Sequence, residues 1–138
     1  MKLVLDNNVL FSIINPFSTA AYLFSSIRAE FLAPEFIKQE LEKHKEECLI
    51  KSGLSKHEFE IRQNEIEESI NFFKSSEYEN FLEKSSDLIS DIKDIDFLAL
   101  ALLTDSAIWS NDPHIKEQSL IPVLTTKDLL VKFIKGGI

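Results

Sequence analysis

The sequence has little cysteine, histidine, glycine or proline, and each shortage excludes a class of protein. Cys48 is the single cysteine, so no intramolecular disulfide can form, and we expect an intracellular protein. His44, His57 and His114 show none of the paired spacings of a zinc site. With three glycines and four prolines, the chain has no linker-like stretch. We therefore expect a single domain over residues 1–138.

Long apolar runs and excess positive charge are also missing. No run approaches the length that spans a bilayer, and the opening residues MKLVLD lack the apolar region of a signal peptide. We therefore expect a cytoplasmic protein with no membrane association. The 23 acidic residues outnumber the 15 basic ones, which gives a formal net charge of -8. Such a surface repels nucleic acid, so any work on nucleic acid requires bound cations.

Hydrophobic residues make up 44% of the chain, enough for a packed core. Short continuous apolar runs predict strands, and apolar residues at helical spacing predict helices. Because these strands and helices alternate, we expect an α/β fold, a three-layer α/β/α sandwich around a central, mostly parallel sheet of four or five strands. The predicted strands cover residues 2–5, 30–34, 107–110 and 121–125, and the predicted helices cover 18–28, 35–50, 55–73, 75–85, 90–106 and 126–138.

Two of the predicted strands deliver a carboxylate at their carboxyl end. Asp6 ends the strand in LVLDNNV, and Asp112 follows the strand in AIWSND. Ligands of an open parallel sheet bind at the carboxyl ends of its strands, so we expect both side chains on one edge. Asn8 and Asn111 stand beside them as neutral oxygen donors. A turn would also explain Asp6 followed by asparagine, so the remaining acidic residues decide between a turn and a site.

Two more carboxylates belong to helices that flank this edge. Glu40 lies one to two turns into the helix after the second strand, and Asp94 lies in the first turn of the apolar helix at 90–106. Four carboxylates gathered without a counterion repel one another, so such a pocket requires a cation. Mg²⁺ or Mn²⁺ takes oxygen ligands of this kind. One or two such ions can activate water for phosphodiester hydrolysis.

Each carboxylate also has an ordinary structural explanation. Asp112 before a proline is a common helix start, and Asp94 could be the capping-box partner of Asp91. Glu40 is close enough to Lys43 for a surface ion pair. Independent helix caps have no reason to fall at corresponding ends of two strands and inside the flanking helices. Their joint occurrence therefore favours a shared site.

Two further aspartates lie next to this set. Asp91 precedes the apolar helix, and Asp96 lies on it, where it could be a secondary ligand or a partner of Lys93. We place both outside the four-carboxylate site, as supporting residues. The basic residues that are candidates for guiding a nucleic-acid backbone are Lys38, Lys43 and Arg28.

The order of these motifs resembles the PIN-domain family, which includes VapC-type toxin ribonucleases, over nearly the whole chain. LDNNVL resembles its opening strand and Asp-x-Asn motif, and FIKQEL resembles the helix that carries its glutamate. DIDFLALAL resembles its Asp-headed buried helix, and WSND its final aspartate. The resemblance implies an acidic quartet of Asp6, Glu40, Asp94 and Asp112, with Asn8 and Asn111 in support.

The resemblance also implies an activity. It implies a Mg²⁺- or Mn²⁺-dependent endoribonuclease with an RNA substrate, often a homodimer, and in the toxin case one neutralised by an antitoxin protein. The ending AIWSNDPHI followed by VLTTKDLL is more similar to stand-alone prokaryotic PIN proteins than to the shorter classical toxins. The segment 55–86 is long enough to add a dimer or partner surface.

Other classes of protein also use strand-terminal aspartates. A haloacid-dehalogenase-type phosphatase needs a second aspartate where this chain has Asn8, and a response-regulator receiver needs an acidic pair where Asn7 follows Asp6. A catalytically silent interaction module of the PIN fold, binding a protein partner or RNA, stays open, because spacing does not show whether the carboxylates converge. Metal-induced thermal stabilisation would separate this alternative from a catalytic site.

Overall fold

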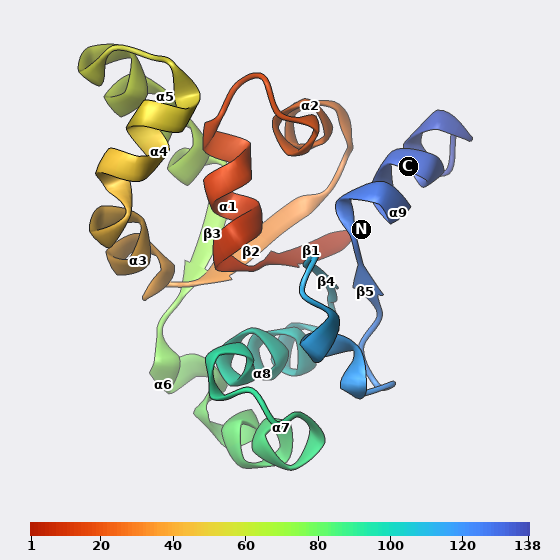
Figure 1. The fold of residues 1–138 in the computed structure, drawn as a ribbon. Helices are drawn as coiled ribbons and strands as arrows, with labels where there is room; N and C mark the ends of the chain where they lie inside the picture. Colours follow the sequence, from red (N-terminus) through yellow and green to blue (C-terminus); the bar gives the residue numbers. More distant parts are fainter.

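The computed structural model describes residues 1–138 and contains one sheet of five strands (Figure 1). The strands are β1 (Lys2–Leu5), β2 (Glu30–Pro34), β3 (Ile70–Phe73), β4 (Ala107–Trp109) and β5 (Val123–Leu124). Their order is β3-β2-β1-β4-β5, and all four neighbouring pairs are parallel. The expected α/β fold around a parallel sheet is confirmed.

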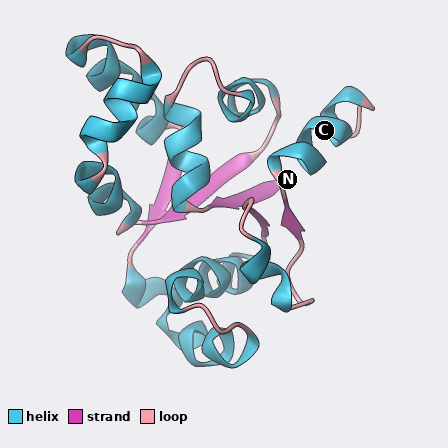
Figure 2. Ribbon diagram, in the orientation of Figure 1, coloured by secondary structure: helices cyan, strands magenta, loops and turns pink.

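Helices cover both faces of this sheet. Figure 1 shows α1 and α2 on one face, and α7 and α8 on the other; Figure 2 shows the strands enclosed between these two layers of helix. The α-helices are α1 (Asn7–Ile14), α2 (Thr19–Ser26), α3 (Ile37–Lys43), α4 (Lys45–Ser52), α5 (Lys56–Glu68), α6 (Ser75–Tyr78), α7 (Leu82–Leu88), α8 (Ile95–Thr104) and α9 (Thr126–Ile134). Three short 3-10 helices are η1 (Glu79–Phe81), η2 (Ile92–Asp94) and η3 (Pro113–Glu117).

The core forms where the apolar strands meet the apolar helix α8. Leu3, Val4 and Leu5 of β1 are fully buried, because β1 is the middle strand and is covered on both faces. Helix α8 contacts β1, β2 and β4 and buries the run from Phe97 to Ala101. Trp109 is also buried, and its indole N–H donates to the Thr126 hydroxyl at 3.0 Å.

The structure differs from the predicted elements in four places, and in one of them the single helix predicted over 75–85 is divided into α6, η1 and α7. Helix α1 is not among the predicted helices, because the polar residues Asp6, Asn7 and Asn8 fit a turn after β1 as well as a helix start. The segment INFF forms β3 and not the end of the helix predicted over 55–73, since pairing with β2 outweighs the helical spacing of Ile70 and Phe73. The helix predicted over 35–50 is two helices, α3 and α4, which meet at His44.

Two helices begin with complete capping boxes. In α5, the Ser55 hydroxyl accepts from the Glu58 N–H, and the Glu58 carboxylate accepts from the Ser55 N–H. Thr125 and Asp128 make the same pair of hydrogen bonds at the start of α9. Both boxes satisfy N–H groups that a helix start leaves without partners.

No single helix of the structure is both long and apolar enough to cross a membrane. Helices α1 and α2 reach that length and composition only when taken together across a 90° bend.

Candidate metal centre

The carboxyl ends of four strands open into one cavity of about 900 Å³. The residues that follow β1, β2 and β3, namely Asp6, Glu35 and Lys74, line it, and so does Asp112 after β4. The cavity lies where the chain order reverses between β1 and β4, the usual ligand position in such sheets. Its walls include all four predicted carboxylates and both supporting aspartates, Asp6, Glu40, Asp91, Asp94, Asp96 and Asp112.

Asp6 is both a helix cap and a cavity residue. Its Oδ1 accepts from the Val9 N–H at 2.8 Å and so caps α1, and its Oδ2 accepts from the Ser110 hydroxyl. The Ser110 hydroxyl in turn accepts from the Asp112 N–H at 3.1 Å. Burial raises the pKa of Asp6, and the hydrogen bonds from Ser110 and Val9 offset that rise only in part. One buried serine, Ser110, therefore bonds both the Asp6 carboxylate and the backbone of Asp112.

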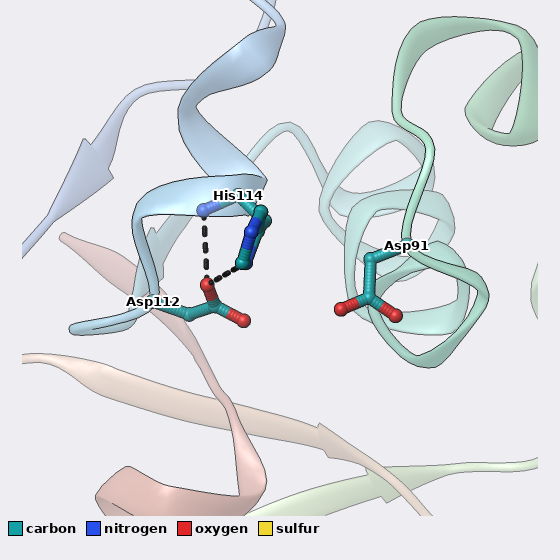
Figure 3. Close-up of side chains that lie close together, drawn as sticks. All are labelled: Asp91, Asp112 and His114. Carbon is teal, nitrogen blue, oxygen red and sulfur yellow. Dashed lines mark hydrogen bonds and ion pairs between the residues drawn. The ribbon is translucent and has the colours of Figure 1, made fainter.

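Asp112 caps the short helix η3, as a helix start before proline requires. Its Oδ1 accepts from the His114 N–H at 2.9 Å and lies 2.9 Å from His114 Nδ1 (Figure 3). These contacts, the backbone one first, lower the pKa of Asp112. Asp91 faces Asp112 and His114 across a gap, and one ligand atom from each of the three residues lies within 4.8 Å of the others.

Asp94 is the carboxylate with the least support from the protein. It is 6% exposed, and its buried Oδ2 has no hydrogen-bond partner. Burial, followed by the charges of Asp112 and Asp91, raises the pKa of Asp94 to about 7. The capping box considered as an alternative role for Asp94 is not formed, because Asp91 accepts from the Lys93 N–H at 3.0 Å and the Asp94 side chain makes no capping bond.

A protein-family model described as PIN domain matches residues 4–132. The chain belongs to the PIN domain family. Among solved structures, it is similar to the crystal structure of VapBC2 from Rickettsia felis bound to a DNA fragment from their promoter. The TM-score is 0.61 at 14% sequence identity, over 91% of this chain and 98% of that chain, which shows a shared fold. A search of curated proteins gives no significant match.

In this PIN domain, Glu40 and Asn8 also line the cavity, but Asn111 does not. Glu40 lies on α3, with its Oε1 3.4 Å from Lys43 Nζ, so the expected surface pair forms at the cavity wall. The Asn111 amide donates to the Thr126 hydroxyl at 3.1 Å, and its oxygen accepts from the Thr126 N–H at 2.9 Å. Asn111 therefore ties the loop after β4 to helix α9, outside the residues that line the cavity.

Asp96, the last of the supporting residues, pairs with Tyr78 and not with Lys93. The Tyr78 hydroxyl donates to Asp96 Oδ2 at 2.6 Å, and both residues line the cavity. The pairing of Asp96 with Lys93 is therefore wrong, because Lys93 makes no ion pair with it. Burial, together with the hydrogen bond to Asp96, raises the pKa of Tyr78 well above its usual value.

The cations at the cavity are not those predicted from the sequence. Lys38 lies over the Phe72 ring, with its Nζ 4.3 Å from the ring centroid, and neither it nor Arg28 lines the cavity. Lys74 and Lys93 do line it. Lys74 follows β3, a strand that the sequence pattern did not indicate, so its place at the cavity could not be predicted either.

The side chains at this cavity fit a hard divalent cation. All the donors of the predicted quartet are carboxylate oxygens, which Mg²⁺ and Mn²⁺ prefer. The unpartnered, buried Asp94 oxygen is the atom that gains most from such an ion, because burial of an uncompensated charge is costly. PIN domains are generally nucleases that use divalent metals, and this donor set agrees with that chemistry.

Proposed function

We propose that this PIN domain is a divalent-metal-dependent endoribonuclease that hydrolyses RNA phosphodiester bonds. The observation that carries the proposal is the convergence of Asp6, Asp94 and Asp112 on one cavity, with a buried Asp94 oxygen that no protein group satisfies. A carboxylate in that position needs a proton or a cation. Its pKa of about 7 means that a cation competes with a single weakly held proton near neutral pH.

Each residue of the proposed centre has a role. Asp6, Asp94 and Asp112 hold Mg²⁺ or Mn²⁺, and Glu40 completes the site from the wall formed by α3. When bound, the ion supplies activation of water and neutralisation of charge on the phosphate. Ser110 fixes the directions of two ligands by bonding the Asp6 carboxylate and the Asp112 N–H.

The supporting residues act around these ligands. Asn8, Asp91 and Asp96 line the cavity beside the quartet, whereas Asn111 acts only on the backbone through Thr126. Lys74 and Lys93 are the lysines placed to contact the phosphates of the RNA. The bound metal and these two side chains would bring an anionic substrate to a chain with a net charge of -8.

The test is cleavage of a mixed set of labelled RNAs and single-stranded DNA with Mn²⁺, Mg²⁺ or EDTA. The purified chain is compared with Asp6→Asn and with Asp87→Asn, a charge-matched control at an exposed site on α7. We expect wild type and Asp87→Asn to cleave RNA only with metal, and Asp6→Asn to lose that cleavage.

A second readout separates catalysis from metal binding alone. Mn²⁺ should raise the thermal midpoint of wild type, since a ligand of the folded state stabilises it by about 2.7 kcal/mol at one hundred times its Kd. Stabilisation of wild type without cleavage of any RNA would leave the metal site in place and reject the ribonuclease activity. Equal inactivity and equal lack of metal response in wild type and Asp6→Asn would refute the proposal.

The proposal extends to partners: a homodimer, and an antitoxin protein of the VapBC type that controls the activity. The structural neighbour is a VapBC2 assembly, and this chain exposes apolar side chains that a partner could cover, Phe17, Tyr22 and Ile134 among them. Light scattering after size exclusion tests the dimer.

The toxin role is tested in growing cells. Expression of wild type should arrest growth, and expression of Asp6→Asn should not. Co-expression of the neighbouring gene tests the antitoxin, because it should relieve the arrest.

A further inference from the structure

A second cavity, of about 380 Å³, adjoins the candidate metal centre. Asn8, Phe11 and His44 line both cavities, so the two lie side by side next to α1. The volume lies in the range of small-ligand sites. An RNA strand that enters the metal centre can therefore place its next nucleotide in this second cavity.

The lining of the second cavity includes an aromatic pair, Phe11 and His44, and the amide side chains of Asn8 and Asn15. Asn8, Phe11 and Asn15 are three and four residues apart, so they share one face of α1. The ring centroids of Phe11 and His44 are 5.4 Å apart, with 54° between the ring planes. His44 stands at the break between α3 and α4, which brings its ring over α1.

We propose that this second cavity is a base-binding subsite. Phe11 and His44 contact the face of an unpaired nucleobase. Asn8 offers an amide donor and acceptor to its edge, and Asn15, whose Oδ1 already accepts from the Phe17 N–H at 3.1 Å, offers its NH2 group as a donor. The base belongs to the nucleotide next to the phosphate held at the metal centre, so the inference rests on the proposed nuclease function. It makes an unpaired base beside the cleaved bond a requirement for recognition.

The charge balance favours an unpaired strand over a duplex. Duplexes are held largely through phosphate contacts with lysine and arginine. The lysines that line the two cavities are Lys74, Lys93 and Lys51, and Lys51 is already 2.8 Å from Glu47 in an ion pair. Stacking on aromatic side chains supplies affinity that does not depend on charge, but it needs an exposed base face.

The test measures stacking apart from cleavage. A short single-stranded RNA carrying the fluorescent base 2-aminopurine is titrated with protein in Ca²⁺ and in EDTA, beside the same strand annealed to its complement. We expect wild type to quench the single strand and not the duplex. Phe11→Leu keeps an apolar side chain but removes the ring, and His44→Ala removes the partner ring; each should weaken binding by about 5- to 100-fold.

The matched control is Phe81→Leu, which removes a half-buried ring that, unlike Phe11, lies outside both cavities, and it should bind like wild type. Phe11-dependent quenching in a protein that cleaves no RNA would support the subsite and reject the nuclease. Metal-dependent cleavage with unchanged binding by Phe11→Leu and His44→Ala would overturn the subsite and leave the nuclease in place. Absence of quenching by wild type, or equal binding of the duplex, would also overturn it.

Discussion

Two aspartates at helix starts, Asp128 in the first turn of α9 and Asp94 just before α8, have opposite electrostatic environments. Asp128 Oδ2 accepts from the Thr125 N–H at 2.9 Å, and the hydrogen bonds from Thr125 lower its pKa. Asp94 has a buried oxygen without a partner, and burial raises its pKa to about 7. A position near a helix start does not by itself decide the protonation state of a carboxylate. The balance between burial and the hydrogen bonds that the carboxylate accepts decides it.

The largest expected effect separates these two aspartates by activity. Asp94→Asn removes a proposed metal ligand, and we expect RNA cleavage to fall by about 100-fold or more. Asp128→Asn changes the same functional group outside the cavity and should cleave at the wild-type rate. Initial rates at saturating Mn²⁺, with folding checked by circular dichroism, make the comparison. Equal activity of Asp94→Asn and wild type would remove Asp94 from the centre.

The second prediction concerns pH and the metal-free protein. The pKa of Asp94 rises from 3.8 to about 7 on folding, so the unfolded chain releases this proton at lower pH than the folded chain does. Stability in EDTA should therefore fall as pH rises from about 4 to about 7, by up to about 4 kcal/mol at 1.36 kcal/mol for each pKa unit. Asp6, whose pKa is also raised, adds a loss of the same sign.

Urea unfolding in EDTA at pH 5.5 and pH 8 measures this loss. Asp94→Asn carries no titrating group there and should be less sensitive to pH than wild type, and more stable than wild type at pH 8. Asp128→Asn should keep the wild-type change in stability between pH 5.5 and pH 8, because the pKa of Asp128 is lowered from 3.8 and lies below this range. If the free energy of unfolding changed equally with pH in wild type and in Asp94→Asn, the charge of Asp94 would be balanced by hydrogen bonds or water in solution.

A third prediction compares two fully buried serines. Ser110 donates to Asp6 and accepts from the Asp112 N–H, whereas the Ser85 hydroxyl on α7 is buried without a partner. Ser110→Ala leaves both groups unpaired, so we expect the free energy of unfolding to fall by about 1 to 3 kcal/mol. We also expect the affinity for Mn²⁺ to fall by about 10- to 100-fold, the usual effect of removing a group that orients a metal ligand. Ser85→Ala should be neutral or stabilising. Calorimetric Mn²⁺ titration and urea unfolding give both values, and equal Mn²⁺ affinity of the two variants would contradict a positioning role.

The sequence predicted the acidic edge better than it predicted its supports. Asp6, Asp94 and Asp112 lie within a few residues of strand or helix ends, so the alternation of elements was enough to bring them together. Ser110 is different, because its role depends on the register in which Leu5 pairs with Trp109 and the next residues face each other. Register between β1 and β4 is a tertiary property that spacing along one chain does not contain.

Two elements were hidden for local reasons, and each hid part of the site. The polar residues between β1 and the apolar part of α1 fit a turn, so the face of α1 that carries Phe11 was not visible in the pattern. Ile70 and Phe73 fit a helix as well as a strand, and pairing with β2 decided the outcome. The position of Lys74 at the cavity could not be predicted before that pairing was known.

The smallest expected effect tests the ordinary member of the opening pair. Thr125→Val keeps the size of the side chain but removes the hydroxyl that accepts from the Asp128 N–H at 3.0 Å. Loss of such a cap costs about 1 kcal/mol, and the cost should be the same with and without Mn²⁺, because the cap is not part of the cavity. Urea unfolding in EDTA and in Mn²⁺ checks this. A Thr125→Val protein that also lost Mn²⁺ stabilisation would show that the start of α9 supports the metal centre, through the contacts of Thr126 with Asn111 and Trp109.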